Sequence, residues 1–373
     1  VMACGPVTLG YCYPAVDDAI RAQLERGIIF SRPNAVEAEV AAMVAEMVPC
    51  AEMTRFFKGG TEANSAAMRL ARSYTGREHF ASCGYRGWHD QWAVAHTPAG
   101  IPSALGDLIH EFRYNDPESL AAIFAAHPGR IAAVILDPVS GEKPLPGFLA
   151  GVRDLAEEHG SLLIFDEIVT GFRLAPGGAQ EYYGVTPDLA VFAKGIANGM
   201  PLSAVTGRRD VMRHATDVFM TLTYGDELLS LAAAKAALGE LQRRDVCGHI
   251  RSIGGRLAAG VRAAIDETGV PFACRGEDAM PAFVATQTFE GRALDRDEQQ
   301  RAWYYLLGGL AERGIMWRKH SLLLPSFSHS DQDVDKAIGA CAEVFGELAA
   351  LLLNDRLRDT VSLMDLPKGF QRL

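Results

Sequence analysis

Two charged side chains that end apolar segments are the first candidates for chemistry in this sequence. Lys194 follows the apolar residues 189–193 and precedes a glycine, and Asp166 ends the apolar run 162–165. A lysine amine in a dry, crowded site loses part of its preference for the charged form, so it can act as a nucleophile or form a Schiff base. A carboxylate that ends a buried strand needs a partner of its own.

The spacing of these two residues predicts that they lie together. Asp166 precedes Lys194 by 28 residues, which is typical of two adjacent parallel strands joined by a crossover connection. Open sheets of this kind bind ligands at the carboxyl ends of their strands. Taken singly, each residue also has a structural interpretation: Asp166 pairs with an arginine such as Arg173, and Lys194 extends to solvent.

Two further segments have residues suited to a flat, anionic ligand. Gly60 and Thr61 begin a predicted helix, where free backbone N–H groups and the helix dipole favour a phosphate. Taken alone, this segment is better explained as a glycine turn with Thr61 as helix cap. Tyr85 lies between glycines after a predicted strand and offers a ring for stacking, although a packed surface loop explains it as well. The segment around Gly60 and Thr61 matches neither a Walker loop nor a dinucleotide-binding fingerprint.

Together the four features describe one ligand with a phosphate, an aromatic ring, a basic ring nitrogen and an aldehyde. That ligand is pyridoxal 5'-phosphate. Its phosphate would bind at Gly60 and Thr61, its ring against Tyr85, its ring nitrogen to Asp166 and its aldehyde to Lys194.

Five segments resemble the class III aminotransferases, which are fold type I pyridoxal-phosphate enzymes, and within them the group similar to glutamate-1-semialdehyde aminomutase. These segments are residues 60–63, 85–90, 166–173, 192–199 and 221–225. The resemblance extends from about residue 9 to about residue 335 and implies a homodimer with shared active sites. It implies a role for each of seven residues: Lys194 as Schiff-base anchor and proton shuttle, Asp166 on the ring nitrogen, Tyr85 and Ile168 on the ring faces, Gly60 and Thr61 on the phosphate, and Thr223 on the phosphate of the partner's site.

The chain departs from the family pattern at three places. Lys58 and Gly59 stand where Asn-Ser is common, Arg86 replaces a frequent histidine, and Asp137 stands where Glu-Pro is usual. The opening strands and helix of the family are not found before Val1, and we expect a truncated chain there.

Hydrophobic periodicity predicts an α/β protein with a large domain and a smaller one. We expect a partial N-terminal segment at 1–30, a large cofactor-binding domain with a mainly parallel sheet at 31–241, and a small α+β domain at 242–373. Expected helices include 37–48, 148–158, 249–267, 299–312 and 333–353, and expected strands include 54–57, 79–83 and 131–136.

Composition narrows the partners and the compartment. The net charge of −10 disfavours nucleic acid, and no apolar stretch is long enough to span a membrane. Seven scattered cysteines without a C-x-x-C pair indicate a reducing cytoplasm. The ten histidines form no H-x-x-x-H or H-E-x-x-H pair, so we expect no metal site.

The function expected from these features is transfer of an amino group from an amino-acid donor, L-glutamate, to a ketone or aldehyde. A keto-sugar, a cyclitol or another precursor of secondary metabolism is the expected acceptor. One alternative is an isomerase of the glutamate-1-semialdehyde 2,1-aminomutase type, whose C-terminal domain has a carboxylate where residues 320–325 of this chain hold no acid. A second alternative is a catalytically silent cofactor-binding protein.

Overall fold

The computed structural model describes residues 2–30, 32–139, 141–319 and 321–363. The chain forms two compact units, one of Gly5–Gly248 and one of His249–Leu373 together with Val1–Cys4. His320, the first residue of the segment compared with the aminomutases, lies outside the described residues.

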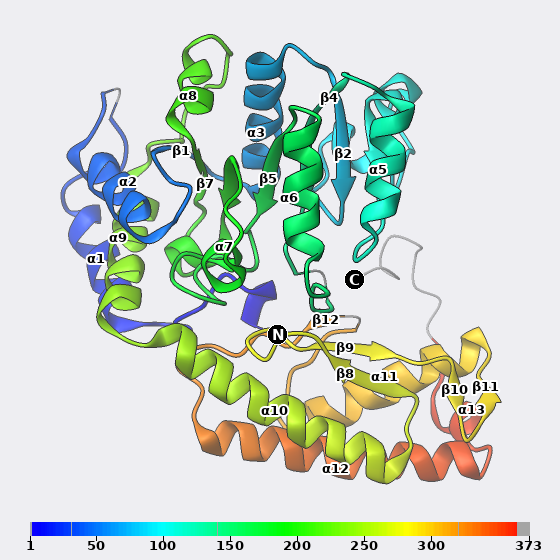
Figure 1. Ribbon diagram of the computed structural model, residues 1–373. Helices are drawn as coiled ribbons and strands as arrows, with labels where there is room; N and C mark the ends of the chain where they lie inside the picture. Colours follow the sequence, from blue (N-terminus) through cyan, green and yellow to red (C-terminus); the bar gives the residue numbers. More distant parts are fainter. Residues whose placement is uncertain (1, 31, 140, 320, 364–373) are drawn as a thin grey trace. The chain divides into compact units, whose positions relative to one another are not determined.

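A seven-stranded sheet is the centre of the described part of Gly5–Gly248 (Figure 1). In spatial order its strands are β1 (Met53–Phe57), β7 (Ser203–Gly207), β6 (Leu189–Phe192), β5 (Leu162–Asp166), β4 (Ile131–Leu136), β2 (His79–Cys83) and β3 (Ile109–Glu111). Strand β7 is antiparallel to both neighbours, and the other adjacent strands pair in parallel. This arrangement confirms the predicted α/β class with a mainly parallel sheet.

Both faces of the sheet are covered, which explains the unbroken apolar sequence of β4. Ala133 and Ile135 pack in one cluster with α3 (Gly60–Thr75). Val134 and Leu136 point to the opposite face and pack in a second cluster with α5 (Pro117–Ala126) and α6 (Phe148–Glu158). Alternate residues of one strand therefore serve two separate helical layers.

The remaining helices of this unit are spread along its sequence. They are α1 (Pro14–Leu24), α2 (Ala35–Met47), the short α4 (Asp90–Ala93), α7 (Ala179–Tyr183) and α8 (Arg209–Met212), and α9 (Leu228–Arg243). Helix α9 packs against both α1 and α2. No helix in the described ranges has both the length and the hydropathy of a membrane span.

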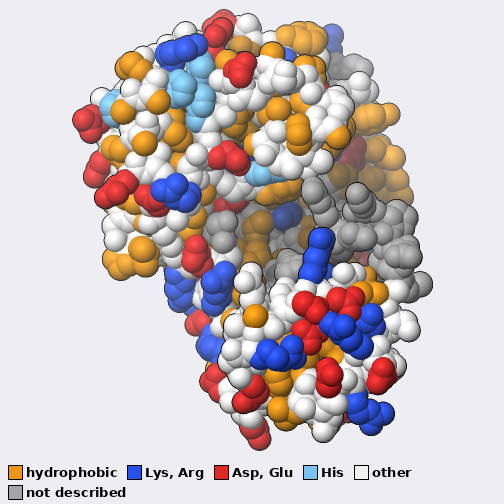
Figure 2. Space-filling model, turned by 90° about the vertical axis from the view of Figure 1, so that its right-hand side faces the viewer, with side chains coloured by type: hydrophobic (Ala, Val, Ile, Leu, Met, Phe, Trp, Pro, Cys, Tyr) orange, Lys and Arg blue, Asp and Glu red, His pale blue; other side chains and the backbone are white. Residues whose placement is uncertain are grey.

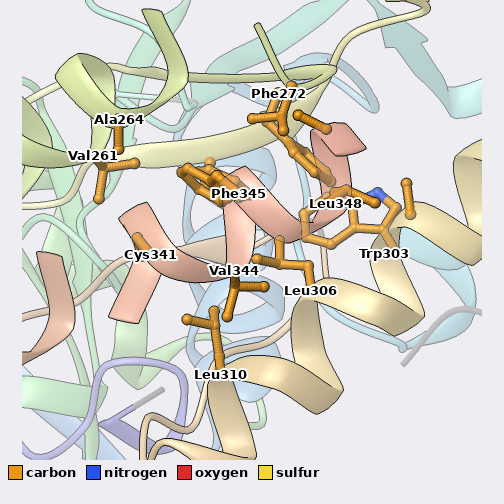
Figure 3. Packing of buried hydrophobic residues seen from close by; sticks show 14 of the residues in the cluster. Val261, Ala264, Phe272, Trp303, Leu306, Leu310, Cys341, Val344, Phe345 and Leu348 are labelled. Carbon is orange, nitrogen blue, oxygen red and sulfur yellow. The ribbon is translucent and has the colours of Figure 1, made fainter. Parts of the chain in front are cut away.

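The second unit is an α+β domain with its own core (Figure 3). Its elements are α10 (Val246–Thr268), β8 (Phe272–Arg275), β9 (Ala282–Ala285), β10 (Thr288–Phe289), β11 (Arg292–Ala293), α11 (Arg296–Glu312), β12 (Ser321–Leu322), α12 (Asp331–Leu353) and α13 (Leu357–Thr360). Strands β12, β9 and β8 form an antiparallel sheet. Aromatic rings fill the core, and the stacked rings of Phe283 and Phe345 lie 6.1 Å apart between centroids.

One ion pair joins the end of β1 to the start of α9, and it involves Lys58 of the first departure from the family pattern. Lys58 Nζ lies 3.1 Å from Glu227 Oε2, and both side chains are largely buried. Glu227 also caps α9 by accepting from the backbone N–H groups of Leu229 and Ser230. Burial raises the pKa of Glu227, but hydrogen bonds from Ser230 and Lys58 outweigh burial, so the net shift is downward.

This pair predicts a pH-dependent contribution to stability. Because the folded pKa of Glu227 is lowered, its contribution is present above the unfolded pKa of about 4.3 and is lost as the pH falls through the folded pKa. Glu227→Gln should therefore lower the free energy of unfolding by about 1–2 kcal/mol at pH 7, with a smaller loss near pH 4. Urea denaturation at the two pH values measures the difference.

The matched control is Glu39→Gln, because Glu39 forms an exposed pair with Lys235. We expect a change within about 1 kcal/mol for that variant. An equal loss for Glu227→Gln at both pH values would contradict a role for its charge.

Candidate functional site

The candidate site lies where several parallel strands end. Asp137 follows β4, Asp166 is the last residue of β5, and Lys194 comes two residues after β6. Strand β5 pairs in parallel with both β4 and β6, so the three residues follow adjacent strands. The segment with Tyr85 and Arg86 follows β2, the next strand along the same edge. Such edges are where open α/β sheets bind ligands.

Asp166 is almost fully buried and well satisfied by hydrogen bonds. Its Oδ2 accepts from Asn64 Nδ2 at 2.8 Å and from Arg86 Nη1 at 2.6 Å. Its Oδ1 accepts the backbone N–H of Ile168 at 3.1 Å. Since a carboxylate oxygen accepts two hydrogen bonds, Oδ1 retains capacity for a ring nitrogen.

Among the described contacts, the arginine that pairs with Asp166 is Arg86, whereas the structural interpretation gave Arg173 as an example. The Arg86 side chain is 1 % exposed and also contacts Asp137, with Nη1 3.0 Å from Oδ1 and Nη2 3.2 Å from Oδ2. Burial lowers the pKa of Arg86, but Asp137 and Asp166 outweigh it and raise the pKa. Burial raises the pKa of Asp137 to about 6, and Arg86 opposes that rise.

The second and third departures from the family pattern are therefore one feature. Arg86 stands where a histidine is frequent and Asp137 where a glutamate is usual, and the two side chains pair directly. Arginine is longer than histidine and aspartate is shorter than glutamate, so the two changes together keep a cation beside Asp166. Sequence reasoning missed this pair because 51 residues separate its members.

Glu167, the neighbour of Asp166, has a structural role. Its side chain is buried and accepts from the hydroxyl of Thr170 and from the backbone N–H groups of Ala179 and Gln180 at 2.8 and 3.0 Å. Burial raises its pKa. Consecutive strand residues point to opposite faces, so only one of the two acids reaches the site.

Lys194 has a left-handed backbone with φ of 47°, which costs a residue other than glycine about 1–2 kcal/mol. It begins a short 3-10 helix, Lys194–Ala197, and its side chain is half-buried. The charge of Lys194 lowers the pKa of Asp137, which places the amine near this cluster. Asn198 fixes the following turn, because its side chain accepts from Leu9 N and donates to Gly10 O.

Closely surrounded glycines and free polar groups mark the start of α3. A Cβ on Gly60 would meet Ile168 Cδ1 at 2.6 Å, and a Cβ on Gly87 would meet Thr61 Oγ1 at 2.2 Å. Within the described residues, the buried Thr61 Oγ1 has no hydrogen-bond partner. Glu62 N and Ala63 N donate to Gly59 O, and among the described contacts the N–H groups of Gly60 and Thr61 have no acceptor. These features fit the phosphate of pyridoxal phosphate.

The two residues expected on the ring faces have different surroundings. Ile168 is half-buried with its side chain against Gly60, and the Tyr85 side chain is largely exposed. Thr223 lies in an exposed segment after the 3-10 helix Arg213–Thr216. Among the described contacts, none joins Thr223 to the other six predicted residues. Asn64 was not predicted, since a single asparagine on α3 gives no signal in the sequence.

Comparison with known proteins identifies the chain. The family model described as aminotransferase class III matches residues 1–345. A 3-aminobutyryl-CoA aminotransferase of Cloacimonas acidaminovorans (strain Evry) is 34% identical over 358 residues, which cover 94% of this chain and 84% of that protein.

Two solved structures are similar along most of the chain. The FumI protein of Sphingopyxis sp. MTA144, solved with pyridoxal phosphate, has a TM-score of 0.86 and 28% identity over 97% of this chain and 85% of its own. A β-phenylalanine aminotransferase from Variovorax paradoxus has a TM-score of 0.82 and 27% identity over 92% of this chain and 82% of its own. The chain belongs to the class III aminotransferases, and it is a pyridoxal-phosphate-dependent transaminase.

Proposed function

We propose that the cofactor binds at the carboxyl edge of the sheet and that seven residues hold it. Lys194 would bind its aldehyde, Asp166 its ring nitrogen, and Gly60 and Thr61 its phosphate, with Tyr85 and Ile168 on the ring faces and Thr223 on the phosphate of the partner's site. The observation that carries this proposal is the position of Lys194 and Asp166 after adjacent parallel strands, around one cluster of buried charge.

When bound, pyridoxal phosphate supplies an electron sink for carbanions next to the amino group. Lys194 Nζ would move the proton between the donor carbon and the cofactor. Asp166 Oδ1 would hold a proton on the ring nitrogen, because a carboxylate favours the protonated form of a neighbouring base. Arg86 and Asn64 keep the Asp166 carboxylate in a fixed orientation through its other oxygen.

The substrate we propose has its amino group β to a carbonyl. Two similar proteins are named for such compounds, a 3-aminobutyryl thioester and β-phenylalanine. L-Glutamate or 2-oxoglutarate would be the second substrate. A keto-sugar, a cyclitol or another precursor of secondary metabolism is the second candidate for the acceptor, because residues 321–325 contain no acid that would hold a charged intermediate as in the aminomutases.

A second copy of the chain is the partner that we propose, giving a homodimer with shared active sites. Large apolar side chains are exposed on Gly5–Gly248, among them Phe30, Phe219 and Tyr224. A cleft beside the Thr223 segment is lined by Phe56, Met220 and Leu222. Exposed apolar side chains of this size support burial against another chain. The seven free cysteines support our proposal of a cytoplasmic location.

The role of Lys194 is tested by the visible absorbance of the purified protein with and without donors. The parent should show a visible band that bleaches on addition of the donor, whereas Lys194→Ala should lack the lysine-dependent band. Turnover should fall by about 10²–10⁴-fold or more, since the variant has no amine to move the proton.

Lys235→Ala is the matched control, because Lys235 pairs with Glu39 on the surface. It should retain both the band and turnover. Substantial turnover by Lys194→Ala would contradict the assignment.

The substrate proposal is tested with nitrogen-15 label. We expect label from 3-aminobutyryl-CoA or 3-aminobutanoate to appear in glutamate when 2-oxoglutarate is present. Label that stays within one carbon skeleton would indicate an isomerase, and no reaction of either β-amino compound would reject the substrate class while leaving the transaminase assignment intact. A cofactor band without any exchange would indicate a silent protein.

The charge cluster predicts a non-additive effect on stability. Arg86→Gln leaves Asp137 and Asp166 together without their cation, so it should lower the free energy of unfolding by about 3–5 kcal/mol. Adding Asp137→Asn removes one of the two facing charges, and the double variant should be more stable than Arg86→Gln alone. Urea denaturation of the parent, Arg86→Gln, Asp137→Asn and the double variant gives the four free energies of unfolding that the comparison needs.

Arg113→Gln is the control, because Arg113 is 78 % exposed in its pair with Asp116. It should change stability by at most about 1 kcal/mol. If the loss of unfolding free energy in the double variant equals the sum of the losses in Arg86→Gln and Asp137→Asn, the proposed coupling is contradicted.

A further inference from the structure

Three histidines that are far apart in the sequence come together at the other end of the sheet. His79 is the first residue of β2, His110 is the middle residue of the edge strand β3, and His127 follows the last residue of α5. One ring nitrogen of each lies within 4.8 Å of the others. The sequence search for metal sites missed this group because it considered only close spacings along the chain.

The ring contacts within the cluster are close. His79 Nδ1 lies 2.8 Å from His110 Nε2, and the rings of His110 and His127 stack with their centroids 3.9 Å apart. His79 is 4 % exposed, and its Nε2 has no hydrogen-bond partner within the described residues. The nitrogen of His79 that faces His110 is Nδ1, so this atom, and not the unpartnered Nε2, would bind a metal ion in the cluster.

The backbone beneath the rings is fixed. His79 N donates to Arg130 O at 3.2 Å, and Arg130 N donates to His127 O at 3.1 Å. The pairing of β2 with β4 shifts register between His79 and Phe80, and such irregularities re-aim side chains. His110 and His127 are half-buried, so solvent reaches one side of the cluster. Figure 2 shows histidine side chains (pale blue) at the surface on the side of the molecule where Figure 1 shows α5.

The rings are suited to bind a cation in their neutral form. A neutral imidazole offers the lone pair of one ring nitrogen to a metal ion.

We propose that His79, His110 and His127 form a site for a divalent transition metal, with Zn²⁺ as the best-suited ion. Three imidazoles suit zinc and its neighbours among the first-row metals, whereas Mg²⁺ and Ca²⁺ require oxygen ligands. Tetrahedral zinc with bonds of about 2.0–2.1 Å places its nitrogen ligands about 3.3 Å apart. Binding would therefore require the nitrogens of His79 and His110 to move apart from 2.8 Å, and water would take the fourth position.

The site is separate from the one that we propose for pyridoxal phosphate. His79 begins β2, whereas Asp166 ends β5, and both strands run parallel to β4 between them. The metal would join the edge strand β3, the start of β2 and the end of α5, so its role is to stabilise this edge. Arg130 and Arg72 disfavour a cation at His79 and Glu78 favours it, which makes the site weaker than a site with acidic ligands.

Calorimetric titration and thermal denaturation of the untagged, cofactor-loaded, chelator-treated protein test this proposal. We expect one equivalent of Zn²⁺ to bind and to raise Tm by several degrees, and Mg²⁺ to do neither. His110→Gln and His127→Gln should each weaken zinc binding at least tenfold and abolish the rise in Tm. These half-buried positions are chosen because substitution of the buried His79 risks misfolding.

The matched control is His96→Gln, because His96 lies near Glu111 on the same edge strand but outside the cluster. His96 itself is not part of the edge strand β3. The His96→Gln variant should bind zinc with the affinity of the parent and show the same rise in Tm. Failure of zinc to bind the parent would overturn the proposal. Zinc binding by His110→Gln and His127→Gln that equals binding by the parent would also overturn it. That result would place the ion at exposed thiols such as Cys4 and Cys12.

Discussion

A buried arginine held between two carboxylates is the interaction on which the proposed amino-transfer site depends. Arg86 lies between Asp137 and Asp166, and all three follow or end parallel strands of one sheet. Charges in such a place are stable only when each is paired and hydrogen-bonded. One cation for two acids leaves a net negative charge, which suits a site that must accept a protonated ring nitrogen and hold a lysine amine. The cluster therefore sets both the geometry and the charge of the edge.

The local backbone is shaped around this cluster at some cost in stability. Lys194 and Asn198 both have positive φ, at 47° and 43°, in a segment of six residues after β6. Such strain persists only where surrounding contacts fix it, and here the side chain of Asn198 ties the turn to Leu9 and Gly10. The residues around Leu9 are buried against the same turn, so the N-terminal segment supports the position of the lysine.

The sequence predicted those elements whose pattern is local. Strands β2 and β4 and helix α6 have the predicted bounds, because an apolar run or a clear amphipathic period marks each. Helix α9 was missed because most of its side chains are buried on all sides, which removes the period. The paired change at Arg86 and Asp137 was visible only as two separate departures from the family pattern. Their compensation is a fact of three-dimensional distance, as is the gathering of His79, His110 and His127.

The two ends of the parallel strands have opposite requirements. At the carboxyl ends, the N–H groups of Gly60 and Thr61 at the start of α3 favour an anionic group, and the carboxylates of Asp137 and Asp166 favour a cationic ring beside it. At the amino end of β2 the polar atoms are ring nitrogens, which are electron-pair donors and suit a metal cation. Because β2 itself spans the distance between the Arg86 segment and His79, a metal that stabilises its start would also restrain the strand that positions Arg86. The histidine cluster would then affect the cofactor site through the rigidity of one strand rather than through any direct contact.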